Sequence, residues 1–420
     1  MGDDGLDIQY AFERSRIWKI KTRLQHTGWL QFAPPLVLGL LWSMVSFILL
    51  QITNDSGDKR FHFILQFMGN AVGAAGGLLL LVGVCDILII KFHLWPFPEP
   101  PPVPKKSNQT EDVFHLMRHR RSCRSFQPRS LDNADRNMIM KCVRDELKQH
   151  RHKSFGAQPI RIEYIKAPSI RVWPGVNARE FLIAIGPAKY DLGCVIDVGR
   201  VLQGVVLNAT ENGLGTCWIG PGADQKSVVR ALTEEGKFDS AVDHVVVVCA
   251  VGYPSMFMPL SLRVGRIFTT NRLPLEELFF DDPTFRRHLD LTKAPFDRFS
   301  KCCEGARWSP SSLNAQPVRC VGVADAGAGG EEQTVRFDFY LTTASRYYAP
   351  TALGIWLRQW EIGCQELGIK GRLDILAEDE RRMRGCSDSS TALPKLPRYG
   401  VSWVMEEDVK TKKKLKAMDL

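Results

Sequence analysis

Two long apolar segments near the N-terminus place the strongest constraint on how this chain can fold. Residues 30–52 contain no charged side chain, and residues 68–90 contain only Asp86. As a helix rising about 1.5 Å per residue, either segment is long enough to cross a hydrocarbon core about 30 Å thick. The sequence therefore predicts a hairpin of two transmembrane helices, at about 30–52 and 68–90, within residues 30–92.

The residues inside these segments support helices that pack closely. Pro34 and Pro35 lie where the first helix begins, a position that tolerates a missing backbone donor. Gly69, Gly73 and Gly77 recur at four-residue spacing in the second segment, which predicts a small-residue face for helix contact.

Asp86 is the one carboxylate within the apolar segments. Such a residue often marks a functional site, but Asp86 lies close to Lys91 and could reach the membrane surface. The interfacial interpretation is favoured.

Basic residues flank the hairpin on one side. Residues 1–29 form a basic segment before the first span, Lys91, Lys105 and Lys106 follow the second, and the connecting turn holds only Lys59 and Arg60. The positive-inside rule then predicts an integral membrane protein with both termini in the cytosol. The first span is too long and too late for a cleaved signal sequence, so we expect an anchor.

Residues 93–110 form a proline-rich spacer. Such composition favours extended, semi-rigid backbone, which predicts a stiff connection that lifts a soluble domain off the bilayer. A ligand for an SH3-type domain is the alternative. The basic tail, residues 406–420, is either attracted to anionic lipid or simply solubilising.

Composition excludes several classes of function. The net charge is +9, but the basic residues are dispersed through the chain, which argues against a nucleic-acid partner. The eleven cysteines include no Cys-x-x-Cys, so we expect no metal site and reduced thiols.

Beyond the spacer, the sequence nearly repeats itself about 155–160 residues apart. Ala-Gln-Pro, an aliphatic residue and Arg occur at 157–161 and again at 315–319. The helical pattern from Asp197 is answered by the pattern from Ala352, and both end on glycine. Residues 242–254 and 397–404 are β-branched runs typical of buried central strands. We therefore predict an α+β fold made of two halves, 111–284 and 285–405, each with helices on a mainly antiparallel sheet.

Five segments of the chain resemble the nitroreductase family. They are RRSCRSF at 120–126, NGLGTCWIG at 212–220, VGYP at 251–254, NRLPLEEL at 271–278 and RWSPSSLNAQP at 307–317. The repeat within one chain is most similar to the branch called putative TM nitroreductases, in which a single chain forms a pseudo-dimer. The resemblance implies a duplicated nitroreductase-like fold behind the hairpin, with FMN bound where the two halves meet.

The resemblance also implies roles for residues of the first half. Arg120, Arg121, Ser122 and Arg124 would bind phosphate and ribityl oxygens, and Arg272 would approach the phosphate from the other side. Gly213, Leu214, Gly215 and Thr216 would bring backbone close to the flavin ring. The arginine segment could instead be a solvated helix end, and the glycine segment only a helix terminus.

The second half would supply the polar edge of the same site. By resemblance, Pro310, Ser311, Ser312, Asn314 and Gln316 face the carbonyls and ring nitrogens of the isoalloxazine, although the same residues also suit a helix-to-strand turn. The first half has RHKSFGAQP in place of PSSLNAQP, and the second lacks the arginine motif. We therefore expect one flavin site per chain and a catalytic domain that is monomeric.

The implied activity is transfer of hydride from NAD(P)H through FMN to a small electron-poor acceptor, such as a nitroaromatic or quinone. The sequence identifies no catalytic side chain. Two alternatives remain open: a flavin-dependent reductive dehalogenase on the same fold, and a membrane-tethered scaffold that has lost its flavin.

Overall fold

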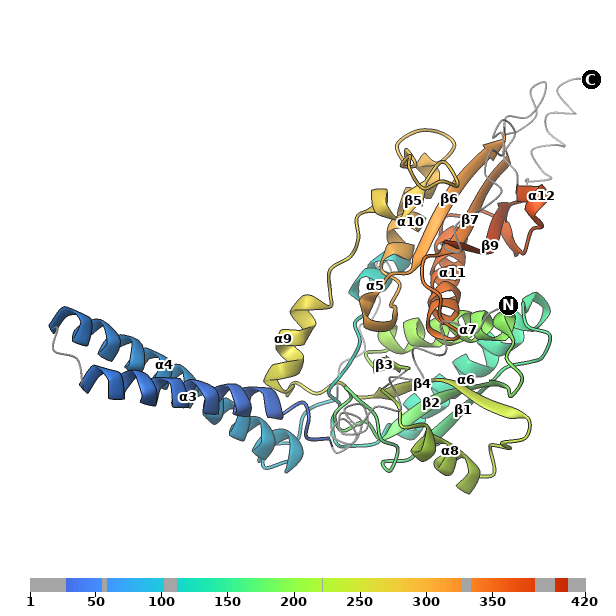
Figure 1. Cartoon of the computed structure of the whole chain (residues 1–420). Coiled ribbons are helices and arrows are strands. Elements are labelled where there is room, and N and C mark those ends of the chain that lie inside the picture. The colour runs from blue at the N-terminus through green and yellow to red at the C-terminus, as the bar shows by residue number, and fades with distance from the viewer. Residues whose placement is uncertain are drawn as a thin grey trace, which may run out of the picture.

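The computed structural model describes residues 28–54, 59–101, 112–220, 222–325, 334–381 and 397–406. It consists of a helical hairpin that projects from an α+β body with two sheets (Figure 1). The basic segment before residue 28, residues 102–111 and the tail beyond 406 lie outside the described residues, so the predictions for them stay predictions.

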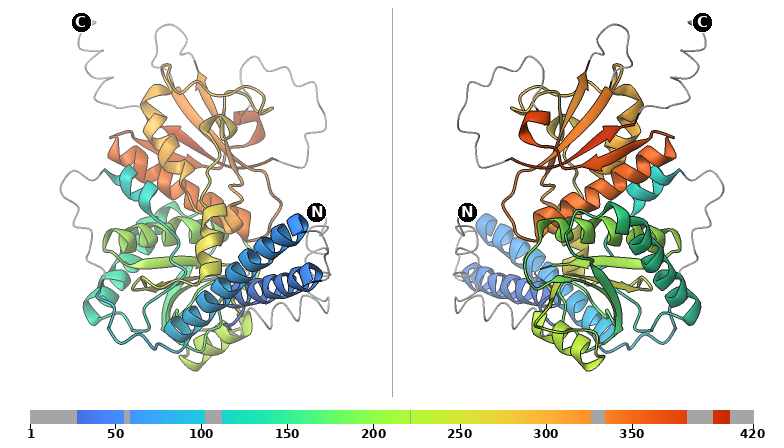
Figure 2. Two further views of the ribbon diagram at one scale, coloured as in Figure 1. Left: turned by 90° about the vertical axis from the view of Figure 1, so that its left-hand side faces the viewer. Right: turned by 90° about the vertical axis from the view of Figure 1, so that its right-hand side faces the viewer.

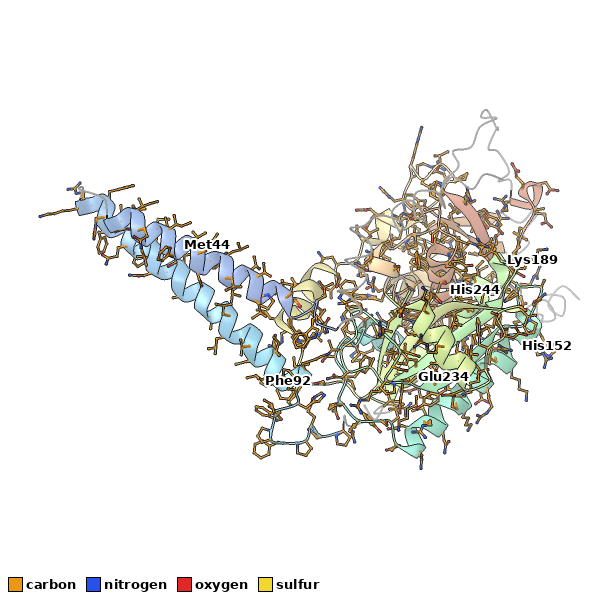
Figure 3. The ribbon with its side chains drawn as sticks, turned by 60° about the horizontal axis from the view of Figure 1, so that its bottom comes forward. Met44, Phe92, His152, Lys189, Glu234 and His244 are labelled. Atoms are coloured by element: carbon orange, nitrogen blue, oxygen red, sulfur yellow. The ribbon has the colours of Figure 1, made fainter. Side chains whose placement is uncertain are left out.

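The hairpin is formed by α3 (Ala33–Asn54) and α4 (Lys59–Asp86), and a π-helical turn, η1 (Ile87–Lys91), continues α4. Large apolar side chains point away from both helices, with Phe63 as much as 70% exposed (Figure 3). Both helices are long and apolar enough to cross a membrane, as predicted, and the second begins earlier than residue 68. The helix α7 (Leu192–Glu211) has a similar composition, but it is buried in the body.

Glycines of α4 set its contact with α3, at two of the three predicted positions: a Cβ on Gly69 would lie 3.0 Å from the Leu50 side chain, and a Cβ on Gly73 would lie 2.6 Å from the Ser46 hydroxyl oxygen. Gly69, Gly76 and Gly83 are buried and seven residues apart, and a Cβ on Gly76 would lie 2.9 Å from the carbonyl oxygen of Gly39. A Cβ on Gly77 would meet nothing within 4 Å. The prediction for Gly77 was wrong because a seven-residue repeat, close to two turns, keeps small residues on one face over several turns.

The first sheet has the order β1-β2-β4-β3 and is antiparallel throughout. Its strands are β1 (Arg161–Lys166), β2 (Glu180–Pro187), β3 (Gly215–Ile219) and β4 (Asp243–Gly252). The valine-rich β4 is internal, as its apolar run predicted. The accompanying helices are α6 (Asn133–His150), α7 and α8 (Gln225–Glu234), whereas α5 (Val113–His119) packs against helices of the second unit and in its core.

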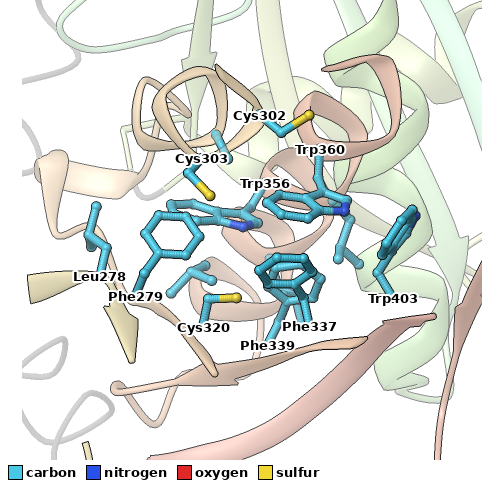
Figure 4. Packing of buried hydrophobic residues seen from close by; sticks show 14 of the residues in the cluster. Leu278, Phe279, Cys302, Cys303, Cys320, Phe337, Phe339, Trp356, Trp360 and Trp403 are labelled. Carbon is cyan, nitrogen blue, oxygen red and sulfur yellow. The ribbon is translucent and has the colours of Figure 1, made fainter. Parts of the chain in front are cut away.

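The second sheet has the order β5-β6-β7-β9-β8. Its strands are β5 (Phe279–Phe280), β6 (Val318–Asp325), β7 (Thr334–Leu341), β8 (Gly371–Asp374) and β9 (Arg398–Met405), and its helices are α10 (Ser300–Arg307), α11 (Tyr348–Glu366) and α12 (Glu378–Arg381). Trp360, Trp403 and Phe337 pack edge to face or tilted in its core (Figure 4). The strand β9 is internal, as predicted.

Residues 271–280 cross from the first half to the second. The short strand β5 pairs in parallel with β6, and Leu278 and Phe279 are buried in the core of the second sheet (Figure 4). The predicted first half thus contributes the edge strand of the second sheet. The two units are thereby tied together by the chain itself.

The helices α7 and α11 lie between the two sheets and cross closely (Figure 2). A Cβ on Gly199 would lie 2.3 Å from the carbonyl oxygen of Thr351, and a Cβ on Gly354 would lie 2.0 Å from that of Ile196. Only glycine permits this approach of the two backbones. The crossing fixes how the two sheets face each other.

The described part of the proline-rich spacer lies against the body. The Glu99 carboxylate accepts hydrogen bonds from the Ser255 hydroxyl (2.9 Å) and the Met256 amide (2.7 Å), and the Gln127 side chain donates to the carbonyl of Pro100 (2.9 Å). Glu99 and Pro100 are therefore held against the body, and the distance that the spacer sets between the domain and a bilayer stays a prediction. The Ser255 hydroxyl and the Met256 amide of the loop at 253–257 hold this segment in place.

Candidate functional site

A cavity of about 450 Å³ lies where the hairpin, the first sheet and the second half meet. Its volume is within the ~300–1,000 Å³ of small-molecule and cofactor sites. Arg120 and Asn314, predicted to face one another across a shared cleft, both line it. Of the predicted residues, the lining includes Arg120, Arg121, Ser122, Arg124, Arg272, Pro310, Ser311, Ser312 and Asn314.

The arginine segment reaches the cavity as an extended strand-like stretch after α5. Ser122 pairs in parallel with Thr216, and the Cys123 amide donates to the carbonyl of Thr216 at 2.8 Å. Extended backbone alternates its side chains, so Cys123 packs on the core while Ser122 and Arg124 line the cavity. The segment is not a solvated helix end.

Arg120 is a buried cation without a carboxylate partner among the described residues. Its side chain is 4% exposed, and its Nε atom has no hydrogen-bond partner. Burial, together with repulsion from Arg272 and Arg121, lowers the pKa of Arg120 to about 9. A buried guanidinium in this state is stabilised by an anion, with which it can form charge-assisted hydrogen bonds.

Arg272 lies next to Arg120, and its guanidinium is likewise buried close to other positive charges. Burial, then repulsion from Arg121 and Arg307, lowers the pKa of Arg272 to about 10. Burial, then repulsion from Arg266, lowers the pKa of Arg121, whose guanidinium lies over the ring of Trp308 at 5.2 Å. Several guanidinium groups converging without a neutralising acid suit a phosphate group.

The second half contributes one wall through the turn η5 (Ser312–Asn314). Leu313, Asn314 and Gln316 all have positive φ, and the Leu313 side chain is 86% exposed at the cavity. The Ser311 hydroxyl accepts a hydrogen bond from the Gln316 amide at 2.9 Å. The turn therefore presents an apolar tip and its hydroxyl groups to the cavity.

Asn314 and Gln316 bind the crossing segment of the chain. Asn314 accepts a hydrogen bond from Arg272 and donates to the carbonyl of Asn271 at 2.7 Å. The Gln316 side chain accepts from the Leu273 amide at 2.9 Å, and Gln316 does not line the cavity. These amides hold the turn against residues 271–273, and a direct contact of Gln316 with flavin stays a prediction.

The predicted glycine segment lies behind the cavity wall. Gly213 ends α7 with φ +76°, Leu214 is buried in the core, and Thr216 pairs with Ser122. A Cβ on Gly215 would lie 2.7 Å from the sulfur of Cys123. Gly213, Leu214, Gly215 and Thr216 therefore seat the arginine segment, whereas the next residues of β3, Cys217 and Trp218, line the cavity.

Cys217 offers no thiolate for chemistry. Burial raises its pKa to about 11, although Arg124 and Arg120 act in the opposite direction. Of the aromatic residues that the motifs contain, Trp218 and Trp308 line the cavity and Phe126 is buried in the core. No cluster of metal-ligating side chains occurs among the residues described.

Sequence reasoning missed several groups of lining residues, one of which lies in the first half and includes Trp173, Pro174, Gly222, Val246 and Val247. The helix α9 (Leu260–Phe268) and the loop after it form one wall, the start of the hairpin forms a second, and α11 with its preceding loop forms a third. They include Leu30, Gln31, Pro34, Ser261, Leu262, Gly265, Arg266, Thr269, Tyr347, Tyr348, Ala352 and Ile355. Arg263 and Arg266, three residues apart among apolar residues, were the one available signal for α9.

The crossing helices present opposite chemistry at repeat-related positions. Aligning Asp197 with Ala352 also aligns Arg200 with Ile355. Ala352 and Ile355 line the cavity, whereas Asp197 and Arg200 form a buried ion pair at 3.3 Å.

Asp197 holds the segment that corresponds to the η5 turn. Its carboxylate accepts from the amides of Phe155 (2.8 Å) and Gly156 (2.9 Å), while Arg200 pairs with Glu361 at 2.8 Å and lies over the ring of Phe155. On the α7 side of the crossing, the charged side chains of Asp197 and Arg200 therefore fill the space. On the α11 side, the apolar Ala352 and Ile355 leave the corresponding space open as part of the cavity.

Residues 112–327 match the family described as "Putative TM nitroreductase". The match covers the first sheet, the crossing segment and the turn η5, and so includes every predicted site residue. No curated protein matches the chain.

Solved structures of nitroreductases are also similar to the chain. A protein described as a putative nitroreductase from Thermotoga maritima is 17% identical, with 70% of this chain and 93% of that chain covered and a TM-score of 0.37. A nitroreductase family protein from Clostridium difficile 630 is 19% identical over 40% and 96% (TM-score 0.29). A nitroreductase with bound FMN from Bacteroides fragilis is 17% identical over 36% and 92% (TM-score 0.27).

Proposed function

Because the chain belongs to the putative TM nitroreductase family, we propose that it is a membrane-anchored, FMN-dependent oxidoreductase. It would take hydride from NAD(P)H and deliver it to an electron-poor acceptor such as a quinone or nitroaromatic. FMN, when bound, supplies the hydride chemistry, and the chain supplies binding and orientation.

The observation that carries this proposal is the buried, unneutralised guanidinium of Arg120. The phosphate of FMN carries nearly two negative charges at neutral pH and fits the cluster formed with Arg121, Arg124 and Arg272. Each charge-assisted hydrogen bond contributes about 1.5–3 kcal/mol to binding. Ser122 adds a hydroxyl at the same wall.

The ring system would occupy the space between the two halves. Ser311 and Ser312 offer hydroxyl groups from the η5 wall, and β3 offers its backbone and Trp218 from the first half. We infer that the two halves are a duplicated unit that forms an intrachain pseudo-dimer. Its second site would be closed by Asp197 and Arg200, which supports one flavin per chain and a monomeric catalytic domain.

The hairpin would anchor this enzyme in a membrane. Its two helices have the length and hydropathy of membrane spans, and many of their large apolar side chains are exposed. With the basic segments on one side, the catalytic domain would face the cytosol.

The direct test is the flavin content of the full chain purified in a mild detergent. We expect yellow protein with one FMN per chain, and loss of most of it in Arg120→Met. Arg230→Met is the matched control, because Arg230 is an exposed arginine on α8, outside the cavity. Wild-type protein that fails to bind added FMN, or an Arg120 variant that keeps as much as the control, contradicts the proposal.

A further inference from the structure

The base of the hairpin is part of the cavity wall. Leu30, Gln31 and Pro34 line the same cavity as Arg120 and the η5 turn. Leu262 and Gly265 of α9 lie on this wall as well, so apolar groups from two membrane-proximal elements border the site. An enzyme that used its anchor only as a tether would not require this arrangement.

The helix α9 is fixed to the hairpin by polar contacts. The Asp86 carboxylate accepts a hydrogen bond from the Leu260 amide at 2.7 Å, and Ser261 donates to the carbonyl of Gln31. A carboxylate at a helix N-terminus satisfies a free amide and complements the helix dipole. Asp86 therefore positions α9, and its partner is this helix end.

Apolar packing strengthens the same junction. Leu262 is buried with Phe32, Ile90 and Val176, which come from α9, the two ends of the hairpin and a loop of the first half. The place of α9 relative to the two spans is thus set by a small core as well as by hydrogen bonds.

Exposed residues around this junction have the composition of a membrane interface. On α9, Val264 is 45% and Ile267 is 67% exposed, and Arg263 and Arg266 lie on the same helix. Aromatic and apolar side chains surround the hairpin base, with Lys91 over the ring of Trp29 at 5.4 Å. They are Trp29, Phe92, Leu94, Trp95, Phe97 and Met256, all exposed. Such residues gather at headgroup level, and amphipathic helices lie in that plane.

Resting on the proposed function, we propose that the acceptor is a lipid-soluble quinone, which reaches the cavity from the bilayer between the start of α3 and α9. Its ring would enter the cavity, and its hydrocarbon tail would lie along Leu30, Pro34 and Leu262. NAD(P)H gives up two electrons and one proton as hydride and leaves as NAD(P)⁺. The quinone gains these and one further proton from water, and leaves as the hydroquinone.

Gly265 provides a test that should not disturb folding. It lines the cavity, and a Cβ placed on it meets nothing within 4 Å. Gly265→Leu would therefore place an apolar side chain in the part of the cavity that α9 borders. Gly77→Leu is the matched control, because Gly77 is also a helical glycine with open space around it and lies outside the cavity.

The experiment uses the full chain in lipid nanodiscs. The binding probe is a benzoquinone with a ten-carbon tail that ends in a photoreactive diazirine, and the labelled peptides are mapped by mass spectrometry. We expect labelling in residues 28–36 and 260–270, suppressed by excess unlabelled tailed quinone. In Gly265→Leu, labelling should fall at least tenfold relative to the Gly77→Leu control, and reduction of the tailed quinone should fall more than reduction of a tailless benzoquinone.

The possible outcomes separate this inference from the proposed function. Wild-type protein without flavin refutes the proposed function. Flavin-loaded protein that is labelled in other segments refutes the membrane route but not the proposed function. The same holds if the protein reduces tailed and tailless quinones equally and Gly265→Leu changes neither rate. Loss of flavin in Gly265→Leu would place the cofactor where we place the tail, and would also refute the route.

Discussion

The guanidinium of Arg272 donates a hydrogen bond to the side-chain oxygen of Asn314, and thereby joins the crossing segment to the η5 turn. The same guanidinium donates to the carbonyl of Trp308 at 3.3 Å. The resemblance assigned Arg272 to the phosphate and Asn314 to the edge of the isoalloxazine, and the two side chains contact each other. The pair aligns a cation of one half with the wall supplied by the other.

Removing the Asn314 side chain should therefore weaken FMN binding through Arg272. Asn314 has φ +58°, so Asn314→Gly deletes the amide without adding backbone strain. Losing an acceptor for a partly buried cation costs about 1–2 kcal/mol, which corresponds to roughly tenfold weaker FMN. Fluorescence titration of the flavin-free protein measures this, with the exposed Asn137→Ala as control. An unchanged dissociation constant would mean that the pair has no part in binding.

A carboxylate on α11 should close the cavity in the way that we propose for Asp197 at the repeat-related position. Ala352 lines the cavity at the position that the repeat aligns with Asp197. In Ala352→Asp, the new charge would pair with an arginine of the cavity and repel phosphate, so FMN affinity should fall more than tenfold. Ala134→Asp, on the exposed first turn of α6, is the control. Normal flavin content in Ala352→Asp would show that a charge at position 352 does not affect binding of the cofactor.

The glycine crossing should be sensitive to a single methyl group. A Cβ at Gly199 would lie 2.3 Å from the Thr351 carbonyl oxygen, so Gly199→Ala must push α7 and α11 apart. Overpacking of this kind costs about 1–3 kcal/mol. We expect a lower Tm in detergent and faster release of FMN, whereas Gly77→Ala, which meets open space, should leave both unchanged. Equal Tm values for the two variants would show that α7 and α11 can move apart without a loss of stability.

The sequence predicted the parts of this protein that depend on local pattern. The apolar runs at 30–52 and 68–90 became helices, the valine run became the internal β4, and glycines with positive φ followed α7 and α11, at Gly213 and Gly368. Arg120 and Asn314 share a cavity because their motifs follow elements that meet at the junction of the halves. Periodicity and turn chemistry carry such information directly.

Tertiary contacts were beyond the reach of these patterns. Asp86 and Leu260 lie far apart in the sequence, and nothing local shows that a carboxylate of the hairpin contacts α9. The parallel pairing of β5 with β6 was not predictable either, because a strand of two residues is too short to show a periodic pattern. The contact of Gly215 with Cys123 was likewise not predictable from the local pattern, and the approach of the segment from Gly213 to a flavin stays a prediction.

The acid stability of the protein should depend on Glu361, which joins α11 to α6 and α7. Burial raises the pKa of this carboxyl, but the charge of Arg200, a hydrogen bond with His150 and the charge of Arg358 outweigh it and lower the pKa to about 2. The unfolded chain has a pKa of 4.5 at this group. Because the folded value is the lower one, the stabilisation is complete above that pH and is lost as the pH falls from about 4.5 to about 2.

A shift of this size corresponds to about 3 kcal/mol. Thermal unfolding of the full chain in detergent, followed between pH 7 and pH 3, should show a steep fall in Tm below pH 5. In Glu361→Gln, Tm should already be lower at pH 7, since Arg200 loses a charged partner at 2.8 Å, and the fall below pH 5 should be shallower. Glu366→Gln, an exposed carboxyl on the same helix, should follow the wild type. If Tm fell in the same way below pH 5 in the Glu361 and Glu366 variants, the ion pairs of Glu361 would not be the contacts that stabilise the packing of α11 on α6 and α7.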